Sequence, residues 1–181
     1  VAAAKQAFPA WAATPAAERG RLLLKLADLI EEHAEELVQL ESLDTGHPIR
    51  DSRRLDVPRT AACFRYFGGM ADKIQGSVIP VEQGFLNYVT REPVGVVGQI
   101  VPWNFPLMFT SWKLGPALAA GNTVVMKPAD LTPGSAWALA EILARAGVPA
   151  GVAMQLAALL ETLLARPQPM TLALGTGRTL R

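Results

Sequence analysis

Two apolar runs in the middle of the chain each end abruptly in polar and turn-forming residues. The first, residues 94–101, is almost continuously apolar and is followed by Pro-Trp-Asn-Phe-Pro. The second, residues 122–126, is followed by Lys-Pro-Ala-Asp. The alanine-rich segment between them can begin a helix at Pro106 and stops at Gly121, where a glycine commonly follows a helix. The pattern therefore predicts a strand buried on both faces, a crossover helix and a second strand.

A further helix is predicted after the second strand. Thr132 and Pro133 offer a side-chain cap followed by a proline at the first helical position, and Gly147 ends the apolar pattern. This alternation of strands and helices favours a parallel sheet with right-handed crossovers. The predicted fold class is therefore α/β.

Residues 1–75 show helical spacing of their apolar positions. Three helices are predicted there, over residues 1–12, 15–40 and 56–74. Thr14 and Pro15 repeat the cap-and-proline start and are predicted to open the second helix. Cys63 lies on the apolar face of the third helix and is predicted to be a small core residue rather than a nucleophile.

The histidines and a glutamate run are the other chemically notable residues of this part. His47 stands in a turn and is interpreted as a surface loop residue, because no partner for catalysis can be named. His33 is a weaker candidate for catalysis. The glutamates are interpreted as a solvated helix face, so no metal site is predicted. They are Glu31, Glu32, Glu35 and Glu36.

Residues 77–80 and 85–91 flank a turn-like Glu-Gln-Gly and predict a β-hairpin. No helix in the neighbouring sequence is placed to cover it, so we expect the hairpin to project from the body. A projecting pair of strands exposes edges that need pairing or protection.

Polar residues stand at the ends of both predicted parallel strands. In open sheets of this kind ligands bind outside the carboxyl ends of the strands, where Asn104, Lys127 and Asp130 fall. The Asn104 amide can donate to an oxyanion formed during attack on a carbonyl, or it can cap the next helix; the residues alone favour neither. Lys127 and Asp130 suit the hydroxyls of a ribose, and the alternative is an exposed ion pair. The G-x-G-x-x-G signature of dinucleotide sites does not follow the first strand.

Composition narrows the function classes. Half of the 181 residues are apolar and only 18% are charged, so a core can form and some apolar surface is available for a partner. A net charge of +1, without a basic stripe, gives no reason to expect nucleic acid or an anionic membrane. The single cysteine excludes an internal disulfide and suits a reducing, cytoplasmic setting. No apolar stretch is long enough to predict a membrane span, and no signal peptide is predicted.

Four motifs stand in order along residues 2–152. They are Glu-Pro-Val-Gly-Val-Val from Glu92, Pro-Trp-Asn-Phe-Pro from Pro102, Pro-Ala-Leu-Ala-Ala-Gly-Asn-Thr from Pro116, and Lys-Pro-Ala-Asp from Lys127. Together they resemble the N-terminal part of NAD(P)-dependent aldehyde dehydrogenases, most of all the betaine-aldehyde type of bacterial enzymes.

The resemblance implies a role for each candidate residue. Asn104 resembles the oxyanion-hole asparagine of the family. Lys127 and Asp130 resemble the pair that holds the adenosine ribose, and a carboxylate there favours NAD over NADP, because a 2′-phosphate would meet a like charge. The segment Ile100, Val101, Pro102 and Trp103 resembles the wall of the family's cofactor cleft.

The resemblance also implies a domain organisation. Residues 1–75 are expected to form the helical part of the cofactor domain. Residues 76–92 are expected to form the projecting hairpin used in oligomerisation. Residues 93–152 are expected to form the first strand–helix–strand–helix of a Rossmann-like NAD-binding sheet. The sheet is expected to be incomplete relative to the family. Residues 153–181 depart from the family pattern, with a predicted helix at 154–164 and a possible strand at 170–174. An atypical ending is slightly favoured there over a degenerate phosphate-binding turn at Gly175 and Gly177.

In the complete enzyme the resemblance implies oxidation of an aldehyde to a carboxylic acid with NAD, by a homo-oligomer. The nucleophilic cysteine and the glutamate base of the family lie beyond the end of this chain. The 181 residues are therefore expected to be inactive alone. The alternative is a truncated, non-catalytic protein that associates through the hairpin and its apolar helix faces.

Overall fold

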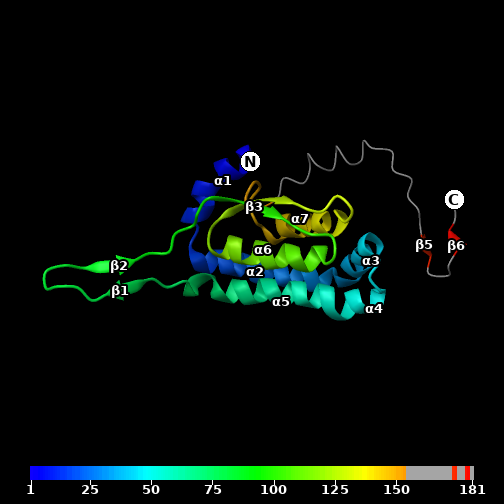
Figure 1. Cartoon of the computed structure of the whole chain (residues 1–181), viewed down its shortest axis with the longest axis horizontal. Coiled ribbons are helices and arrows are strands. Elements are labelled where there is room, and N and C mark those ends of the chain that lie inside the picture. The colour runs from blue at the N-terminus through cyan, green and yellow to red at the C-terminus, as the bar shows by residue number, and fades with distance from the viewer. Residues whose placement is uncertain (154–172, 175–177, 180–181) are drawn as a thin grey trace.

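The computed structural model describes residues 1–153, 173–174 and 178–179. Helices form most of the body, a small parallel sheet lies against them, and a long hairpin projects from one end (Figure 1). The α-helices are α1 (Ala2–Ala13), α2 (Ala16–Glu32), α3 (Ala34–Thr45), α4 (Ile49–Asp51), α5 (Val57–Met70), α6 (Pro106–Ala119) and α7 (Gly134–Ala146). A π-helical turn, Ser52–Asp56, precedes α5, and a 3-10 turn, Ala71–Lys73, follows it. The strands are β1 (Ser77–Ile79), β2 (Asn87–Val89), β3 (Val96–Ile100), β4 (Thr123–Lys127), β5 (Ala173–Leu174) and β6 (Arg178–Thr179).

The single helix predicted over residues 15–40 is in fact two helices. α2 ends at Glu32 and α3 begins at Ala34, with His33 between them at φ −98° and ψ 19°. Ile30 and Leu37, on either side of the break, are both buried. Because the apolar spacing continues across His33, the pattern could not reveal the break.

The predicted cap at Thr14 is wrong. Its hydroxyl donates backward to the Ala10 carbonyl at 2.9 Å, at the end of α1, and Pro15 occupies the N-cap position of α2. The Thr14 side chain therefore satisfies a carbonyl at the end of α1, and the start of α2 has no side-chain cap.

The start of α7 is capped from another part of the chain. The Asp44 carboxylate, near the end of α3, accepts hydrogen bonds from the Gly134 amide at 2.6 Å and the Ser135 amide at 3.3 Å. A carboxylate also lies favourably in the field of a helix N-terminus. The cap predicted at Thr132 is therefore wrong: Pro133 is the N-cap residue, and Asp44 satisfies the exposed amides.

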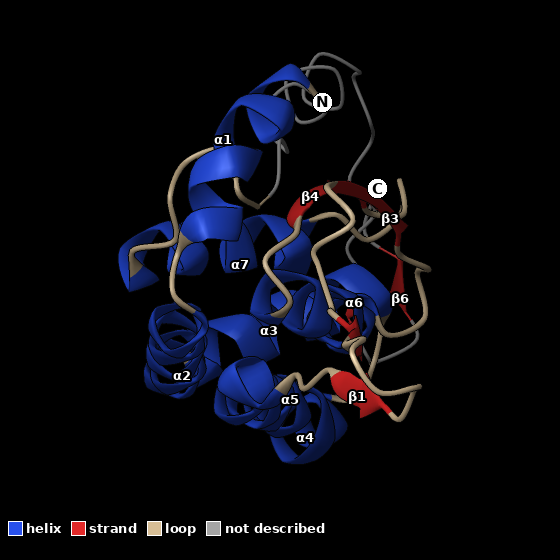
Figure 2. Ribbon diagram, turned by 90° about the vertical axis from the view of Figure 1, so that its left-hand side faces the viewer, coloured by secondary structure: helices blue, strands red, loops and turns tan. Residues whose placement is uncertain are grey.

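α2 and α5 lie side by side and approach closely at two glycines (Figure 2, where α2 is seen end-on). A Cβ atom added at Gly20 would lie 2.5 Å from the Gly68 carbonyl oxygen, and one added at Gly68 would lie 3.0 Å from the Gly20 carbonyl oxygen. Leu23 and Phe64 are fully buried on the same two helices. The absence of both side chains thus sets the distance between the helices at the centre of the core.

α1 packs against the sheet. The Thr123 hydroxyl at the start of β4 donates to the Ala4 carbonyl at 3.0 Å, in a buried position. A Cβ atom at Gly151 would lie 2.8 Å from the Ala3 carbonyl oxygen. The first helix of the chain therefore rests on residues that come more than a hundred positions later.

β3 and β4 form the predicted parallel pair, joined by α6 as the crossover. Their register runs from Val96 opposite Thr123 to Ile100 opposite Lys127. On the other side of β4, Ala153 forms a parallel bridge with Val124, so a third position of the sheet begins where the first described segment ends. The prediction that β3 is buried on both faces is wrong for the described residues, because its two valines are only half-buried and Ile100 is 75% exposed.

The predicted hairpin is confirmed. β1 and β2 pair antiparallel, from Ser77 opposite Val89 to Ile79 opposite Asn87, and all six strand residues are exposed. Gly84 lies in the connecting turn at φ +98°, a conformation that favours glycine. The hairpin extends away from the body, as expected from its lack of helical cover (Figure 1).

The predicted helix at 154–164 lies outside the described residues, as do Gly175 and Gly177. Of the possible strand at 170–174, only β5 is described, and it pairs antiparallel with β6. None of the helices in the described part of the chain is long and apolar enough to cross a membrane.

Candidate functional site

The carboxyl ends of β3 and β4 bring two segments of the predicted site together. Ile100 and Lys127 are partners in the register, and the Val101 amide continues the pairing by donating to the Lys127 carbonyl at 3.0 Å. Residues 101–104 and 128–130 therefore leave the sheet at the same edge. This is the edge at which open parallel sheets bind ligands.

The segment after β3 presents apolar surface at this edge. Ile100 is 75% exposed and Trp103 is 59% exposed, whereas Val101 is buried in the core. Pro102 is exposed between them. An exposed apolar wall beside charged groups is suited to a ligand with both a flat ring and polar substituents.

Asn104 is half-buried in the loop that leads into α6. Phe105 is the N-cap residue of that helix and has no side-chain cap bond. The helix-cap alternative for Asn104 is therefore wrong in this structure. Asn104 follows the exposed wall in the chain and directly precedes Phe105.

Lys127 and Asp130 form an ion pair after β4. The ammonium lies 2.9 Å from Asp130 Oδ1 and also donates to the Pro128 carbonyl at 3.1 Å. The two side chains are 52% and 70% exposed, so the pair contributes at most about 1 kcal/mol to stability. Both charged groups are thus accessible to a ligand, and the fold loses little if a ligand rearranges them.

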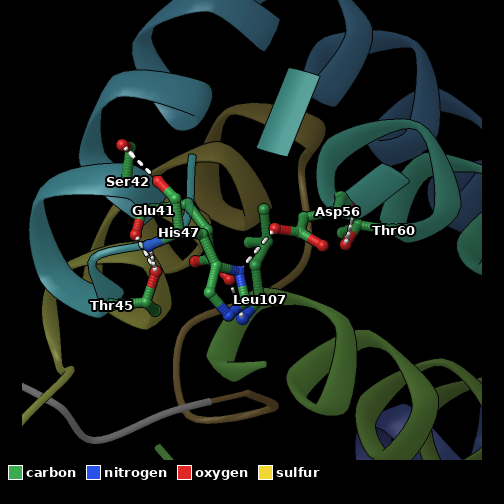
Figure 3. Close-up of polar contacts among 7 residues, drawn as sticks. All are labelled: Glu41, Ser42, Thr45, His47, Asp56, Thr60 and Leu107. Atoms are coloured by element: carbon green, nitrogen blue, oxygen red, sulfur yellow. Dashed lines mark hydrogen bonds and ion pairs between the residues drawn. The ribbon is translucent and has the colours of Figure 1, made fainter. Parts of the chain in front are cut away.

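A buried polar cluster lies behind the loop that carries Asn104, and the sequence did not reveal it. Glu41 from α3, His47 from the following turn and Asp56 at the end of the π-helical turn offer donor atoms that all lie within 4.8 Å of one another (Figure 3). His47 Nδ1 lies 3.0 Å from Asp56 Oδ2. Glu41 Oε1 accepts from the Leu107 amide, in the first turn of α6, at 3.4 Å.

The interpretation of His47 as a surface loop residue is wrong. Its side chain is 24% exposed, and its ring meets the ring of Phe105 edge-on, with centroids 4.9 Å apart. Its backbone is also fixed, because the His47 amide donates to the Thr45 hydroxyl at 3.1 Å and the Ser42 hydroxyl donates to the His47 carbonyl at 2.7 Å (Figure 3). Asp56, nine residues further on, was the missing partner.

Glu41 is fully buried, although it is a carboxylic acid. Burial raises its pKa to about 7, and the nearby Ser135 hydroxyl, Leu107 amide and His47 offset only part of the effect, while Asp56 adds to it. The helical spacing of the sequence does indicate that this position is buried. Glu41 follows Leu37 and Val38 by four and three residues, so it lies on the buried face of α3.

Cys63 is half-buried on α5 rather than in the core. Burial raises the pKa of its thiol, and the Ser111 hydroxyl offsets only part of that effect. A thiol with a raised pKa is mostly protonated near neutral pH and is a poor nucleophile. The prediction that Cys63 is not a catalytic nucleophile agrees with this environment.

The profile of the Aldehyde dehydrogenase family matches residues 1–168. Two solved structures are similar to this chain over 84% of its length: PnpE from Pseudomonas sp. WBC-3 in complex with nicotinamide adenine dinucleotide, at 76% identity and TM-score 0.83, and a Bacillus cereus aldehyde dehydrogenase in complex with NAD+, at 51% identity and TM-score 0.82. The NADP/NAD-dependent aldehyde dehydrogenase PuuC of Escherichia coli is 52% identical over 142 residues, which are 78% of this chain and 29% of PuuC.

The chain belongs to the aldehyde dehydrogenase family. It spans 31% of the length of each of the two solved chains. The described fold is accordingly the N-terminal part of the family's α/β fold.

Proposed function

We propose that this chain forms the oxyanion-donor and ribose-binding part of an NAD-dependent aldehyde dehydrogenase site. The observation that supports the proposal is the common edge of β3 and β4, where the segments after Ile100 and Lys127 leave the sheet as neighbours. The first segment carries the apolar wall and Asn104, and the second carries the Lys127–Asp130 pair. The proposed site residues would thus share one edge of the sheet.

NAD fits the chemistry of the residues after β4. The Lys127 ammonium can donate to one ribose hydroxyl, and the Asp130 carboxylate can accept from another. The side chains of the wall that would lie beside the ligand are those of Ile100, Pro102 and Trp103, because Val101 is buried in the core. The carboxylate disfavours a 2′-phosphate, so we place NAD ahead of NADP. When bound, NAD would accept the hydride removed from the aldehyde carbon.

The Asn104 amide is proposed to donate to the oxygen of the aldehyde. As a nucleophile adds to the carbonyl carbon, that oxygen becomes negatively charged, and an uncharged donor held by the loop stabilises it without reorganisation. In related systems the loss of one such donor lowers the rate by about 10²–10³.

We place the nucleophile and the general base outside the described residues. The reaction needs an activated thiolate, whereas burial raises the pKa of the Cys63 thiol on α5. We therefore expect the 181 residues alone to show no aldehyde-dependent formation of NADH.

Calorimetric titration with NAD tests the ribose assignment. Because the chain carries only part of the expected pocket, we expect weak binding of NAD at most, still weaker binding of NADP, and an affinity for NAD about tenfold lower in Lys127→Ala, since the variant lacks a charged hydrogen-bond donor. Lys25→Ala is the matched control, since it removes another exposed lysine, on α2 rather than at the end of β4. Equal affinity of wild type and Lys127→Ala for NAD would overturn the assignment.

A second candidate function is self-association through the hairpin, with or without catalysis. It is favoured by the apolar side chains that the hairpin exposes, which are Val78, Ile79, Phe85, Leu86, Tyr88 and Val89. Such a contiguous apolar surface on a projecting strand pair favours pairing with a second copy. In the family setting this would be the expected oligomerisation element.

Analytical ultracentrifugation distinguishes this candidate. We expect the wild type to sediment as a dimer or larger species, and a Phe85→Ser/Leu86→Ser double variant to sediment as a monomer. Leu43→Ser is the control, because Leu43 is 74% exposed, as much as the hairpin residues, but lies on α3. A monomeric wild type, or a double variant that associates like the wild type, would exclude a role for the hairpin in self-association.

A further inference from the structure

The cluster of Glu41, His47 and Asp56 has the composition and geometry of a metal site. We propose that these three side chains bind one divalent transition-metal ion, with Zn²⁺ as the best fit. The site would lie behind the loop between β3 and α6 and would be separate from the sheet edge that carries Asn104, Lys127 and Asp130.

The distances are close to those that Zn²⁺ requires. Ligand atoms about 2.0–2.2 Å from a tetrahedral zinc are roughly 3.3–3.6 Å from one another. His47 Nδ1 and Asp56 Oδ2 are 3.0 Å apart in a hydrogen bond, whose proton would be released when the ion binds, and all three donor atoms lie within 4.8 Å of one another. The Glu41 carboxylate would move toward the other two ligands to complete a three-ligand arrangement.

Glu41 supplies an independent indication of a missing ligand. Its side chain is fully buried, and within the described residues Oε2 makes no hydrogen bond of good geometry. The Ser135 hydroxyl, which lowers the pKa of Glu41, likewise makes no hydrogen bond of good geometry within the described residues. Since an unpaired buried carboxylate oxygen is costly, an occupant on this side of Glu41 would remove a substantial penalty.

The charge of the cluster also favours a cation. With an ion bound, both carboxylates would be ionised and the imidazole neutral, so the three ligands would carry two negative charges. Among the described residues, Asp56 and His47 are the charged side chains that shift the pKa of Glu41. A divalent ion would neutralise the cluster as the ligands approach it.

The ligand types select among metal ions. One imidazole nitrogen with two carboxylate oxygens suits Zn²⁺ and Mn²⁺ better than Mg²⁺ or Ca²⁺, which prefer all-oxygen sites. Zn²⁺ binds such a set more tightly than Mn²⁺. His47, whose side chain is 24% exposed, provides the path from solvent and room for a water as the fourth ligand.

Local structure holds the ligands in place. Asp56 closes the π-helical turn Ser52–Asp56, and single π-helical turns are frequent at functional sites. Its backbone carbonyl accepts from the Thr60 hydroxyl at 2.8 Å. The bonds of Thr45 and Ser42 fix the backbone of His47 in the same way (Figure 3). The cluster is thus largely preorganised in the absence of the ion.

Calorimetric titration with ZnCl₂, together with thermal melting, tests the proposal on the whole chain after treatment with a chelator. We expect the wild type to take up one equivalent of Zn²⁺ and to melt at a higher temperature with Zn²⁺ than without it. His47→Gln and Asp56→Asn should each weaken binding by at least about tenfold, since even outer-shell partners of metal ligands contribute 10–100-fold.

The chain offers a matched control, because its only other histidine is His33. His33→Gln should bind Zn²⁺ like the wild type, and a Cys63→Ser background removes the thiol as a competing ligand. The proposal is overturned if the wild type takes up no Zn²⁺ saturably, or if His47→Gln and Asp56→Asn bind as tightly as the wild type. Loss of binding in His33→Gln alone would overturn it as well.

Discussion

Gly20→Ala should lower the free energy of unfolding by about 2 kcal/mol, although alanine is the better helix former. In a helix interior, alanine is favoured over glycine by about 1 kcal/mol. At Gly20, however, the new methyl group would lie 2.5 Å from the carbonyl oxygen of Gly68, which belongs to the backbone of α5. Overpacking in a core costs about 1–3 kcal/mol, and the upper end applies where the obstructing atom cannot rotate away. The steric cost therefore exceeds the gain in helix propensity.

Gly69 provides the matched control for this prediction. It lies in the same α5, and a Cβ atom added there would meet nothing within 4 Å. Gly69→Ala should therefore leave stability unchanged or raise it by up to about 1 kcal/mol. Denaturant unfolding of both variants measures the contrast. If Gly20→Ala unfolds at the same denaturant concentration as Gly69→Ala, then α2 and α5 are not in backbone contact.

The second large effect is a loss of stability with rising pH that comes from Glu41. In the metal-free protein, we expect Glu41 to remove about 3 kcal/mol from the free energy of unfolding between about pH 4.5 and pH 8. The folded protein holds the proton up to a pKa of about 7, whereas the unfolded chain releases it near the ordinary value of 4.5. The unfolded state therefore binds fewer protons in this window, so the contribution of Glu41 is complete below pH 4.5 and is lost as pH rises through 7.

Glu41→Gln isolates this contribution. The variant keeps an acceptor for the Leu107 amide but cannot ionise, so the difference in stability between wild type and variant should change with pH by the stated amount. His47 and Asp56 face Glu41 and are present in both proteins. Glu36→Gln, at an exposed position five residues earlier on α3, should follow the wild-type curve. Parallel curves for wild type and Glu41→Gln, measured with a chelator, would show that the carboxyl is not buried in the protonated form.

The sequence predicts conformations that a helix end itself requires, but it does not predict when a distant side chain takes over the role of a local cap. Gly121 and Gly147 end their helices at φ +86° and φ +97°, as predicted, because a left-handed residue is a need of the helix end itself. Thr132 satisfies the same kind of local rule and yet does not cap α7. Asp44 reaches the free amides from α3, and no pattern near Thr132 contains that information.

The candidate site also has a part that the sequence predicts and a part that it does not. The edge that carries Asn104, Lys127 and Asp130 follows from the pairing of two strands, and the apolar runs that form the strands are visible directly. The Glu41–His47–Asp56 cluster depends on a helix, a turn and a π-helical turn that meet in space, and the intervals between these residues match no regular ligand motif. A buried acid on an apolar helix face was the one available signal.

The packing of α1 against the sheet affects the order in which the chain folds during synthesis. The Thr123 hydroxyl donates to the carbonyl of Ala4, and Gly151 lies against the carbonyl of Ala3, so these partners of α1 are made more than a hundred residues after it. At about 5–20 residues per second, α1 waits on the order of ten seconds before β4 emerges from the ribosome. During that interval α1 lacks its native contacts with the sheet, and its apolar side chains are available to chaperones. α1 is thus made well before it can dock.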